Sequence, residues 1–350
     1  MRILYLFPDK MHPELDRVNK GDAPSERMYG LVELRRSGHQ VELSDSRWQG
    51  RIGRFRLWLK HYDVNLSDLR TIIVMRRYDV VVVKDDLSLI LTLAALLVGT
   101  KIVYLDSLFI VPRRRWRKLA YQMNFKLAHG IVIYCRSQID AWGDYFSLSP
   151  QTPKVLPYTI DLPFYRTHGV VSRPARDYVL SIGRDPGRDF PTLVEAARDI
   201  GMDLKIITLP YLLKGIDLKQ PYLQVLERLS YEELFKLYAG ARFVVIPLKK
   251  GVTYPSGVRA LLEAMALEKA VICSRTPVLE EYAKEGEGVT YVEPENISQL
   301  RNAMQALARD DTAITSLGRQ GRQMVQARYS MEAFTSKFEQ YLNEVVNSGK

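Results

Sequence analysis

Residues 244–275 read VVIPLKKGVTYPSGVRALLEAMALEKAVICSR and contain three kinds of element in order. The apolar run at 244–246 predicts a buried strand, and the Gly-, Pro- and Ser-containing stretch after it predicts a loop. Apolar residues then recur at helical spacing, at Val258, Leu261, Leu262 and Met265, before another β-rich run at 270–274. This order of elements is typical of a parallel α/β sheet.

One face of the predicted helix is polar. Ser256, Arg259 and Glu263 fall on one stripe, because seven residues make about two helical turns. A Ser-Gly loop that opens a helix offers free amides and the positive end of the helix dipole to an anionic ligand. A carboxylate two turns further along can accept hydrogen bonds from sugar hydroxyls. The alternative is an ordinary strand-loop-helix unit in which Ser256 only caps the helix.

The whole chain alternates strand and helix patterns, which predicts two doubly wound parallel sheets. In the first half, strands are expected at 3–7, 40–44, 71–75, 80–83, 101–105 and 130–134, and helices at 25–36, 88–97, 114–127 and 136–145. In the second half, strands are expected at 178–183, 203–208, 222–225, 243–247, 270–274 and 288–292, with helices between them and a last helix at 331–346. The Pro-rich stretch 147–177 predicts a linker. The apolar stretch 87–99 is too short for a bilayer and predicts a buried helix.

Length and composition fit a soluble protein of two α/β domains, with 350 residues of which 47% are hydrophobic and 26% charged. Cys135 and Cys273 lie far apart in apolar contexts, which favours free thiols in a reducing cytoplasm. The start, MRILYLFPDK, lacks a signal-peptide pattern and predicts a strand. Residues 1–160 hold 25 Lys and Arg against 16 Asp and Glu, whereas the rest hold 25 against 24. The first half is therefore expected to meet an anionic partner.

Several segments resemble one enzyme family. The string SGVRALLEAMALEKAVICSRTPVLEE at 256–281 resembles the donor-binding segment of family 4 glycosyltransferases, which are retaining enzymes of the GT-B fold. Segments at 31–41, 156–161, 179–184, 188–197 and 229–241 resemble further parts of that family in the same order. The resemblance implies two Rossmann-like domains that face each other across a cleft, with a C-terminal helix that crosses back to the first domain.

The resemblance also implies a donor site in the second domain. Glu263 matches the second glutamate of the family pattern, which binds the nucleotide ribose. Pro255 stands at the position of the first glutamate, which in the family binds the transferred sugar. Ser256, Gly257 and Val258 match the phosphate-facing loop that opens the helix.

Two arginines lie in the stretch GRDPGRDF, which follows a predicted strand and precedes a helix that Asp189 can cap. The resemblance implies that Arg184 and Arg188, next to Gly183, grip the donor diphosphate. Fixed cations stabilise the charge that builds on a leaving phosphate without a metal. The alternative is surface ion pairing with Asp185 and Asp189. No G-x-G-x-x-G pattern or Cys/His/Asp cluster occurs, so neither NAD, FAD nor a metal cofactor is expected.

The resemblance also implies site roles for two residues in the first half of the chain. Gly21 lies where the family has a glycine-rich loop on the acceptor side. Asp106 falls at a strand end where many members place a histidine near the reacting carbon, and such strand ends face the ligand crevice. Asp106 is expected to bond the donor sugar or assist the acceptor. The alternatives are a plain turn at Gly21 and a helix-capping Asp-Ser pair at Asp106.

Two basic segments interleave arginine with aromatic residues, RWQGRIGRFRLWLKHY at 47–62 and RRRWRKLAYQMNFKL at 113–127. This composition suits the headgroup region of an anionic bilayer, and nucleic acid attracts the same residue types. A core-facing helix with a solvated basic back is a further alternative. The resemblance favours the membrane, because many such enzymes act on lipid-linked acceptors. The residues expected to face the membrane are Arg54, Trp58, Arg113, Arg114, Arg115, Trp116 and Arg117.

The expected organisation is an acceptor-binding domain at 1–160, a donor-binding domain at 161–330 and a crossing helix at 331–350. The expected activity is retaining transfer of a sugar from a nucleotide-diphosphate sugar to a lipid-linked or glycan acceptor at the cytoplasmic membrane face. The protein is expected to be peripherally membrane-associated, to need no metal and to bind no nucleic acid. The alternatives are a non-hydrolysing nucleotide-sugar epimerase on a similar fold, and a GT-B binding protein that has lost catalysis, which Pro255 would favour.

Overall fold

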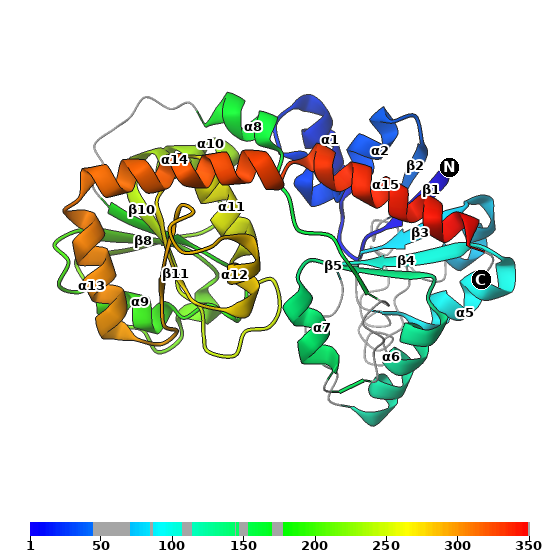
Figure 1. The fold of residues 1–350 in the computed structure, drawn as a ribbon, viewed down its shortest axis with the longest axis horizontal. Helices are drawn as coiled ribbons and strands as arrows, with labels where there is room; N and C mark the ends of the chain where they lie inside the picture. Colours follow the sequence, from blue (N-terminus) through cyan, green and yellow to red (C-terminus); the bar gives the residue numbers. More distant parts are fainter. Residues whose placement is uncertain are drawn as a thin grey trace. The chain divides into compact units, whose positions relative to one another are not determined.

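The computed structural model describes residues 1–44, 71–84, 87–106, 114–143, 145–146, 153–169 and 178–348. The chain divides into two compact units (Figure 1). Unit 1 comprises Met1–Pro157 together with Met331–Lys350, and unit 2 comprises Tyr158–Ser330. The last helix therefore belongs with the N-terminal part of the chain.

Unit 1 is built on a parallel six-stranded sheet in the order β2-β1-β3-β4-β5-β6. The strands are β1 (Arg2–Leu6), β2 (Gln40–Ser44), β3 (Val80–Val83), β4 (Lys101–Leu105), β5 (Gly130–Ile133) and β6 (Pro153–Val155). Every residue of β3 and β5 is buried, as expected for a parallel sheet covered on both faces. Helices α5 (Leu89–Val98), α6 (Arg115–Leu127) and α7 (Arg136–Gly143) pack Leu91, Tyr121 and Trp142 into one core with the strands.

The remaining helical segments of unit 1 are α1 (His12–Lys20), η1 (Ser25–Met28), α2 (Leu31–Arg36), η3 (Met75–Arg77) and α15 (Met331–Asn347). Helix α15 packs on α2 so closely that a β-carbon added to Gly30 would lie 3.3 Å from the Phe334 ring. A hydrogen bond of 2.8 Å between His39 and Glu339 joins the same parts of the chain. The residues that α15 buries, Phe334, Phe338, Leu342 and Val345, recur at helical spacing, which explains why the sequence predicted this helix.

Unit 2 repeats the design, with the strand order β12-β11-β10-β7-β8-β9. Its strands are β7 (Tyr178–Ile182), β8 (Asp203–Ile207), β9 (Leu223–Leu226), β10 (Ala241–Ile246), β11 (Val271–Ser274) and β12 (Val289–Val292). Its helices are α8 (Leu162–His168), α9 (Phe190–Ala197), η4 (Pro210–Leu213), α10 (Tyr231–Gly240), α11 (Val258–Ala266), α12 (Pro277–Tyr282), α13 (Ile297–Ala308) and α14 (Asp311–Arg328). The prediction of two doubly wound parallel sheets is confirmed.

Four local predictions were wrong. Residues 71–74 are helical rather than a strand, and β3, the strand that follows this β-branched run in the chain, already pairs with β1 and β4 on its two sides. The helix expected at 25–36 is interrupted at Tyr29 and Gly30, whose φ angles are 52° and 83°. The expected linker 147–177 contains β6 and α8. Helix α5, expected to be buried, leaves Leu97 87% exposed.

The strand order reverses once in each sheet, between β1 and β3 in unit 1 and between β10 and β7 in unit 2. Open α/β sheets bind ligands outside the carboxyl ends of their strands at such a reversal, because the flanking connections leave in opposite directions there. Each unit therefore has one edge at which a ligand site is expected.

Candidate functional site

In unit 2, the loops that follow β7 and β10 lie together at the reversal point. Backbone hydrogen bonds tie them, from the Asp189 amide to the Pro247 carbonyl (3.1 Å) and from the Lys249 amide to the Gly187 carbonyl (2.9 Å). Asp189 also caps α9 by accepting from the Thr192 amide at 3.3 Å, as the sequence predicted. The first loop therefore has a fixed backbone, which can position its charged side chains.

Arg188 lies across Gly183 in this loop. A β-carbon added to Gly183 would lie 2.1 Å from Nε of Arg188, so only glycine leaves room for the guanidinium here. Arg188 is 5% exposed, and its Nε donates to Asp185 at 2.9 Å. Its Nη1 is buried and has no hydrogen-bond partner among the residues that the structure describes. An unsatisfied buried guanidinium nitrogen is costly, and an anionic ligand would remove that cost.

Asp185 holds the two loops together. Its carboxylate accepts from Nε of Arg188, from the Gly187 amide at 3.1 Å and from the Ser256 hydroxyl at 2.5 Å. A β-carbon on Gly187 would lie 2.7 Å from the Tyr254 hydroxyl, so this approach is also close. Burial and Asp185 raise the pKa of Tyr254 to about 12, and this hydroxyl therefore stays protonated and able to donate. The predicted alternative of a surface ion pair does not describe Arg188, which is buried.

Helix α11 begins at Val258, two residues after Ser256. The cap residue is Gly257, with a φ of 81°, and glycine supplies no side chain to the amides of the first turn. Ser256 is 3% exposed and bonds Asp185, so the alternative in which Ser256 caps the helix does not describe this loop. Val258, the first residue of α11, is buried. The structure thus places Gly183, Arg188, Ser256 and Gly257 in one cluster at the start of α11.

Glu263 lies further along α11, in a second cluster that is also buried. Its Oε1 accepts from Nε of Arg259 (2.7 Å) and from the Tyr165 hydroxyl (2.9 Å), and its Oε2 accepts from the Tyr238 hydroxyl (3.2 Å). Burial and Glu263 raise the pKa of Tyr238, while the charges of Arg259 and Arg188 oppose the rise. Arg188 therefore acts electrostatically on this cluster too.

Arg184 differs from Arg188. Its side chain is exposed, and its carbonyl accepts from the Tyr211 hydroxyl at 3.3 Å. The two arginines predicted to act together thus stand in different environments, one buried and fixed, the other on the surface of unit 2.

In unit 1, the corresponding edge carries Asp106, directly after β4. Its φ of 55° is unusual for a residue other than glycine. Asp106 is 6% exposed, pairs with Nζ of Lys84 at 3.0 Å and accepts from the Tyr29 hydroxyl at 3.3 Å. Burial raises the pKa of Asp106, and Lys84 and Tyr29 oppose the rise. Because Lys84 follows β3, this pair lies beside the reversal point of the first sheet.

The other predicted site residues have separate surroundings. Gly21 ends α1 with a φ of 81° and its amide bonds the Val18 carbonyl at 3.0 Å, which is the geometry of a helix C-cap. Arg114, Arg115 and Trp116 are exposed at the start of α6, and Arg117 is half-buried. Arg54, Trp58 and Arg113 lie outside the described residues.

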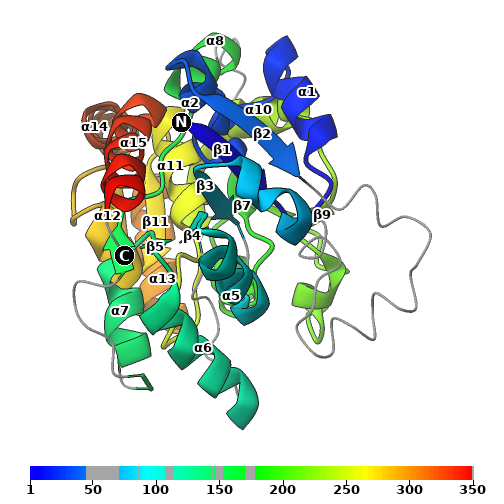
Figure 2. The same cartoon turned by 90° about the vertical axis from the view of Figure 1, so that its right-hand side faces the viewer.

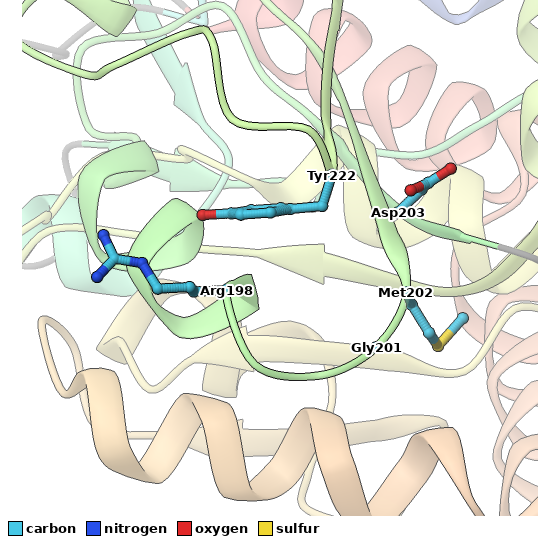
Figure 3. Close-up of a pocket in the computed structure, with 5 residues that line it drawn as sticks. All are labelled: Arg198, Gly201, Met202, Asp203 and Tyr222. Carbon is cyan, nitrogen blue, oxygen red and sulfur yellow. The ribbon is translucent and has the colours of Figure 1, made fainter.

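A pocket of about 340 Å³ opens elsewhere in unit 2, and Figure 3 shows its lining by Arg198, Gly201, Met202, Asp203 and Tyr222. It lies where β8 begins, whereas the Arg188 cluster lies where β7 ends, so this pocket is no part of the candidate site. Within the described ranges, no group of three or more His, Cys, Asp or Glu residues is arranged to hold a metal ion.

Sequence reasoning named Arg259 on the polar stripe of Ser256 and Glu263, and Asp185 as an ion-pair partner of the arginines. It missed Tyr165, Lys84 and Tyr29. Tyr165 lies 98 residues from Glu263 and Tyr29 lies 77 residues from Asp106, so no local pattern reveals these contacts.

Comparison with known proteins agrees with this geometry. Residues 188–340 match the family model described as "Glycosyl transferase-like". No curated protein matches the chain. A glycosyltransferase from Rickettsia africae has a similar structure, with a TM-score of 0.73 at 14% identity over 99% of both chains.

Two further structures are similar. Anabaena Alr3699/HepE in complex with UDP-glucose has a TM-score of 0.70 at 13% identity and covers 98% of this chain and 100% of that one. Sucrose-phosphate synthase from Thermosynechococcus elongatus has a TM-score of 0.68 at 15% identity over 99% of both chains. The family-model match supports the prediction of a glycosyltransferase. The chain therefore has the GT-B fold, and residues 188–340, most of unit 2 and the start of α15, are glycosyltransferase-like.

Proposed function

We propose that this protein transfers a sugar from a nucleotide-diphosphate sugar, with UDP as the favoured nucleotide, and retains the configuration at the transferred carbon. The observation that carries the proposal is Arg188, a buried guanidinium whose Nη1 has no hydrogen-bond partner among the described residues, beside the start of α11. UDP is favoured because the similar Anabaena structures hold UDP and UDP-glucose.

The Arg188 cluster suits a diphosphate leaving group. Negative charge builds on the β-phosphate as the sugar departs, and a fixed cation together with free helix amides stabilises that charge more than the ground state. These positive groups are already in place in unit 2, so the proposal needs no bound metal. Asp185 accepts three hydrogen bonds, which makes it a poor nucleophile, and this agrees with a retaining reaction without a covalent enzyme intermediate.

We further propose that unit 1 binds the acceptor, and that Asp106 contacts the reacting sugars. Its carboxylate lies at the strand ends beside Lys84. Because its pKa is raised, Asp106 takes up a proton at a higher pH than an ordinary aspartate does, which suits a group that exchanges protons with a substrate. A lipid-linked or glycan acceptor at the cytoplasmic membrane face remains the proposed substrate. Glu263 is proposed to bind the ribose, after a rearrangement of its present partners.

Two arginine variants test the donor site. Turnover is followed as UDP released from UDP-glucose, and UDP binding by calorimetry. Arg188→Ala is expected to reduce turnover about 100-fold, the scale for losing one fixed donor to a developing anion. Arg188→Lys keeps the charge but not the two-nitrogen geometry and should recover part of the loss. Arg184→Ala, at an exposed position, should lose less than Arg188→Ala.

The controls separate folding from function. Each variant must keep the wild-type melting temperature without nucleotide, because Arg188 also pairs with Asp185. A folded Arg188→Ala protein with wild-type turnover and UDP affinity would refute the donor site. If wild-type protein binds none of UDP, GDP, ADP or dTDP, the transferase proposal itself fails.

A further inference from the structure

Helix α5 of unit 1 is apolar on its outer side as well as its inner one. Its sequence is LILTLAALLV, and only Leu91, Thr92 and Ala95 are buried. The side chains of Leu97 (87% exposed), Ile90, Leu93, Leu96 and Val98 (each about 40%) face away from the core. An ordinary surface helix places charged or polar residues there. A contiguous apolar exposure of this kind marks an interaction site.

Helix α6 continues the same surface. It lies beside α5, and a buried hydrogen bond joins Thr92 of α5 to Asn124 of α6 (Figure 2). Both helices pack into one core on one face of the sheet, so their outer sides point away from the same face. On α6 the exposed apolar residues are Leu119 (60%), Trp116 (43%) and Met123 (36%). These residues and those of α5 form what we call the α5–α6 surface.

The charged residues of the two helices all have one sign. Helix α5 carries no charged residue, and α6 carries Arg115, Arg117, Lys118 and Lys126 with no acidic residue, while the exposed Asp140 lies on the next helix, α7. Arg114, Arg115 and Lys126 are exposed on or beside α6. Two of these arginines stand at the start of the helix, where the dipole favours acidic residues. Basic residues at this end lower the stability of the helix, which indicates that their positive charge has a function.

We propose that the α5–α6 surface docks on an anionic lipid bilayer. The apolar side chains of both helices enter the boundary between headgroups and acyl chains, and the arginines at the start of α6 bind lipid phosphates. Helix α5 has ten residues and is about 15 Å long, half the thickness of a hydrocarbon core, so it lies along the membrane plane. Within the described residues, no helix is long and apolar enough to span a bilayer.

Charge decides between a membrane and a second copy of this chain. A twofold interface would bring the same surface of both copies together, and the exposed arginines of one would meet those of the other. Neither α5 nor α6 carries an acidic residue that could pair with them. An anionic bilayer instead supplies phosphates at the headgroup level, where basic side chains beside an apolar patch can reach them. The inference goes beyond the proposed function, since docking requires no nucleotide.

Vesicle co-sedimentation of the full-length protein tests the inference. Vesicles of phosphatidylcholine with 30% phosphatidylglycerol are compared with pure phosphatidylcholine, at low and high salt. Wild-type protein is expected to bind the anionic vesicles at least tenfold more tightly, and the preference should shrink with salt because screening weakens the attraction.

Two pairs of matched variants isolate the surface. The double variant Arg114→Glu with Arg115→Glu should bind about 30-fold more weakly or worse, and acidic residues there suit the helix dipole, so folding is preserved. Lys214→Glu with Lys219→Glu makes the same charge change at exposed positions of unit 2 and should have little effect. Leu97→Gln with Leu119→Gln should weaken binding about tenfold at any salt, whereas Leu218→Gln, also exposed, should not.

Three results would overturn the inference. Wild-type protein could ignore anionic vesicles, or the Lys214 and Lys219 variant could lose as much binding as the arginine variant. Sedimentation velocity could instead show a dimer that Leu97→Gln with Leu119→Gln dissociates, in which case the surface is a self-interface. UDP binding by the same variants is measured in parallel and should stay at the wild-type level. Lost docking and a failed donor site are thereby distinguished.

Discussion

Substituting Gly183 by alanine tests the Arg188 site without removing any charge. The added β-carbon would lie 2.1 Å from Nε, 2.5 Å from Cζ and 2.7 Å from Cδ of Arg188, all below the closest distance that real β-carbons keep. The backbone of Gly183 does not need a positive φ, so alanine is tolerated there except for this contact. The guanidinium is enclosed and must leave its place. Asp185 then loses its partner, and the nucleotide loses the proposed cation.

The size of the effect follows from the contact that is lost. Hydrogen bonds to charged groups contribute about 1.5–3 kcal/mol, which corresponds to a roughly 10- to 150-fold weaker Kd for UDP. Calorimetric titration with UDP measures this directly. Gly143→Ala is the matched control, because a β-carbon there meets no atom within 4 Å and the change is otherwise identical.

A double-mutant cycle makes the test decisive. If Gly183→Ala acts only by displacing Arg188, then adding it to Arg188→Ala should cost nothing further, since the smaller side chain leaves room for the β-carbon. The single and double variants should therefore bind UDP equally weakly. Additive losses, or a Gly183→Ala protein with wild-type affinity, would show that Arg188 is not the group that holds the nucleotide.

Three further predictions concern other carboxylates. Glu263→Gln leaves the half-buried Arg259 guanidinium without its counter-charge and should lower the free energy of unfolding by about 1–3 kcal/mol as well as weaken UDP binding. Urea unfolding and calorimetry measure both, and unchanged UDP affinity would leave Glu263 a structural role only. Asp106→Asn should remove the acidic limb of the pH–rate profile for UDP-glucose hydrolysis. The reason is that the raised pKa of Asp106 makes the wild-type carboxylate take up a proton at a higher pH than an ordinary aspartate does. An unchanged profile would refute the proposed contact of Asp106 with the reacting sugars. Asp79 accepts from the Arg2 amide at 2.7 Å, and this bond with the Arg2 charge holds its pKa below the usual value. The folded state therefore binds a proton at Asp79 less readily than the unfolded state does. Asp79→Ala should lower the free energy of unfolding by its largest amount above about pH 4, and this loss should disappear as the pH falls further. A difference in urea midpoints that does not change with pH would contradict the prediction.

The sequence predicted the sheets well because their strands carry a local signal. The Val-rich segments of β3 and β10 are continuous apolar runs between turn residues, which identifies buried parallel strands without tertiary information. Residues 71–75 have an equally β-branched composition, yet residues 71–74 are helical, and the neighbouring strand β3 pairs with β1 and β4 instead. Local pattern therefore reports preference, and the competition among segments decides the outcome.

The candidate site was predictable in its loops but not in its contacts. Gly183 and Ser256 stand out in short motifs, and the structure places Gly183 against Arg188 and Ser256 against Asp185, the partner of Arg188. From the sequence, Asp185 was expected only as an ion-pair partner. In the structure it also joins two loops, because it bonds Ser256, which lies 71 residues further along the chain. The burial of Arg188 is likewise a property of the packed fold, since a basic residue in a loop is expected to be exposed.

The return of α15 to unit 1 makes unit 2 an insertion within unit 1. The two ends of unit 2 lie side by side, since Ile160 pairs with Ser330 and the Ile160 amide bonds the Tyr329 carbonyl at 3.1 Å. During synthesis, unit 2 is complete before the last helix leaves the ribosome, whereas unit 1 lacks the contacts of Phe334 and Tyr341 until then. Residues 158–330 are therefore a natural fragment for separate expression, and unit 1 alone needs its two pieces rejoined by a short linker.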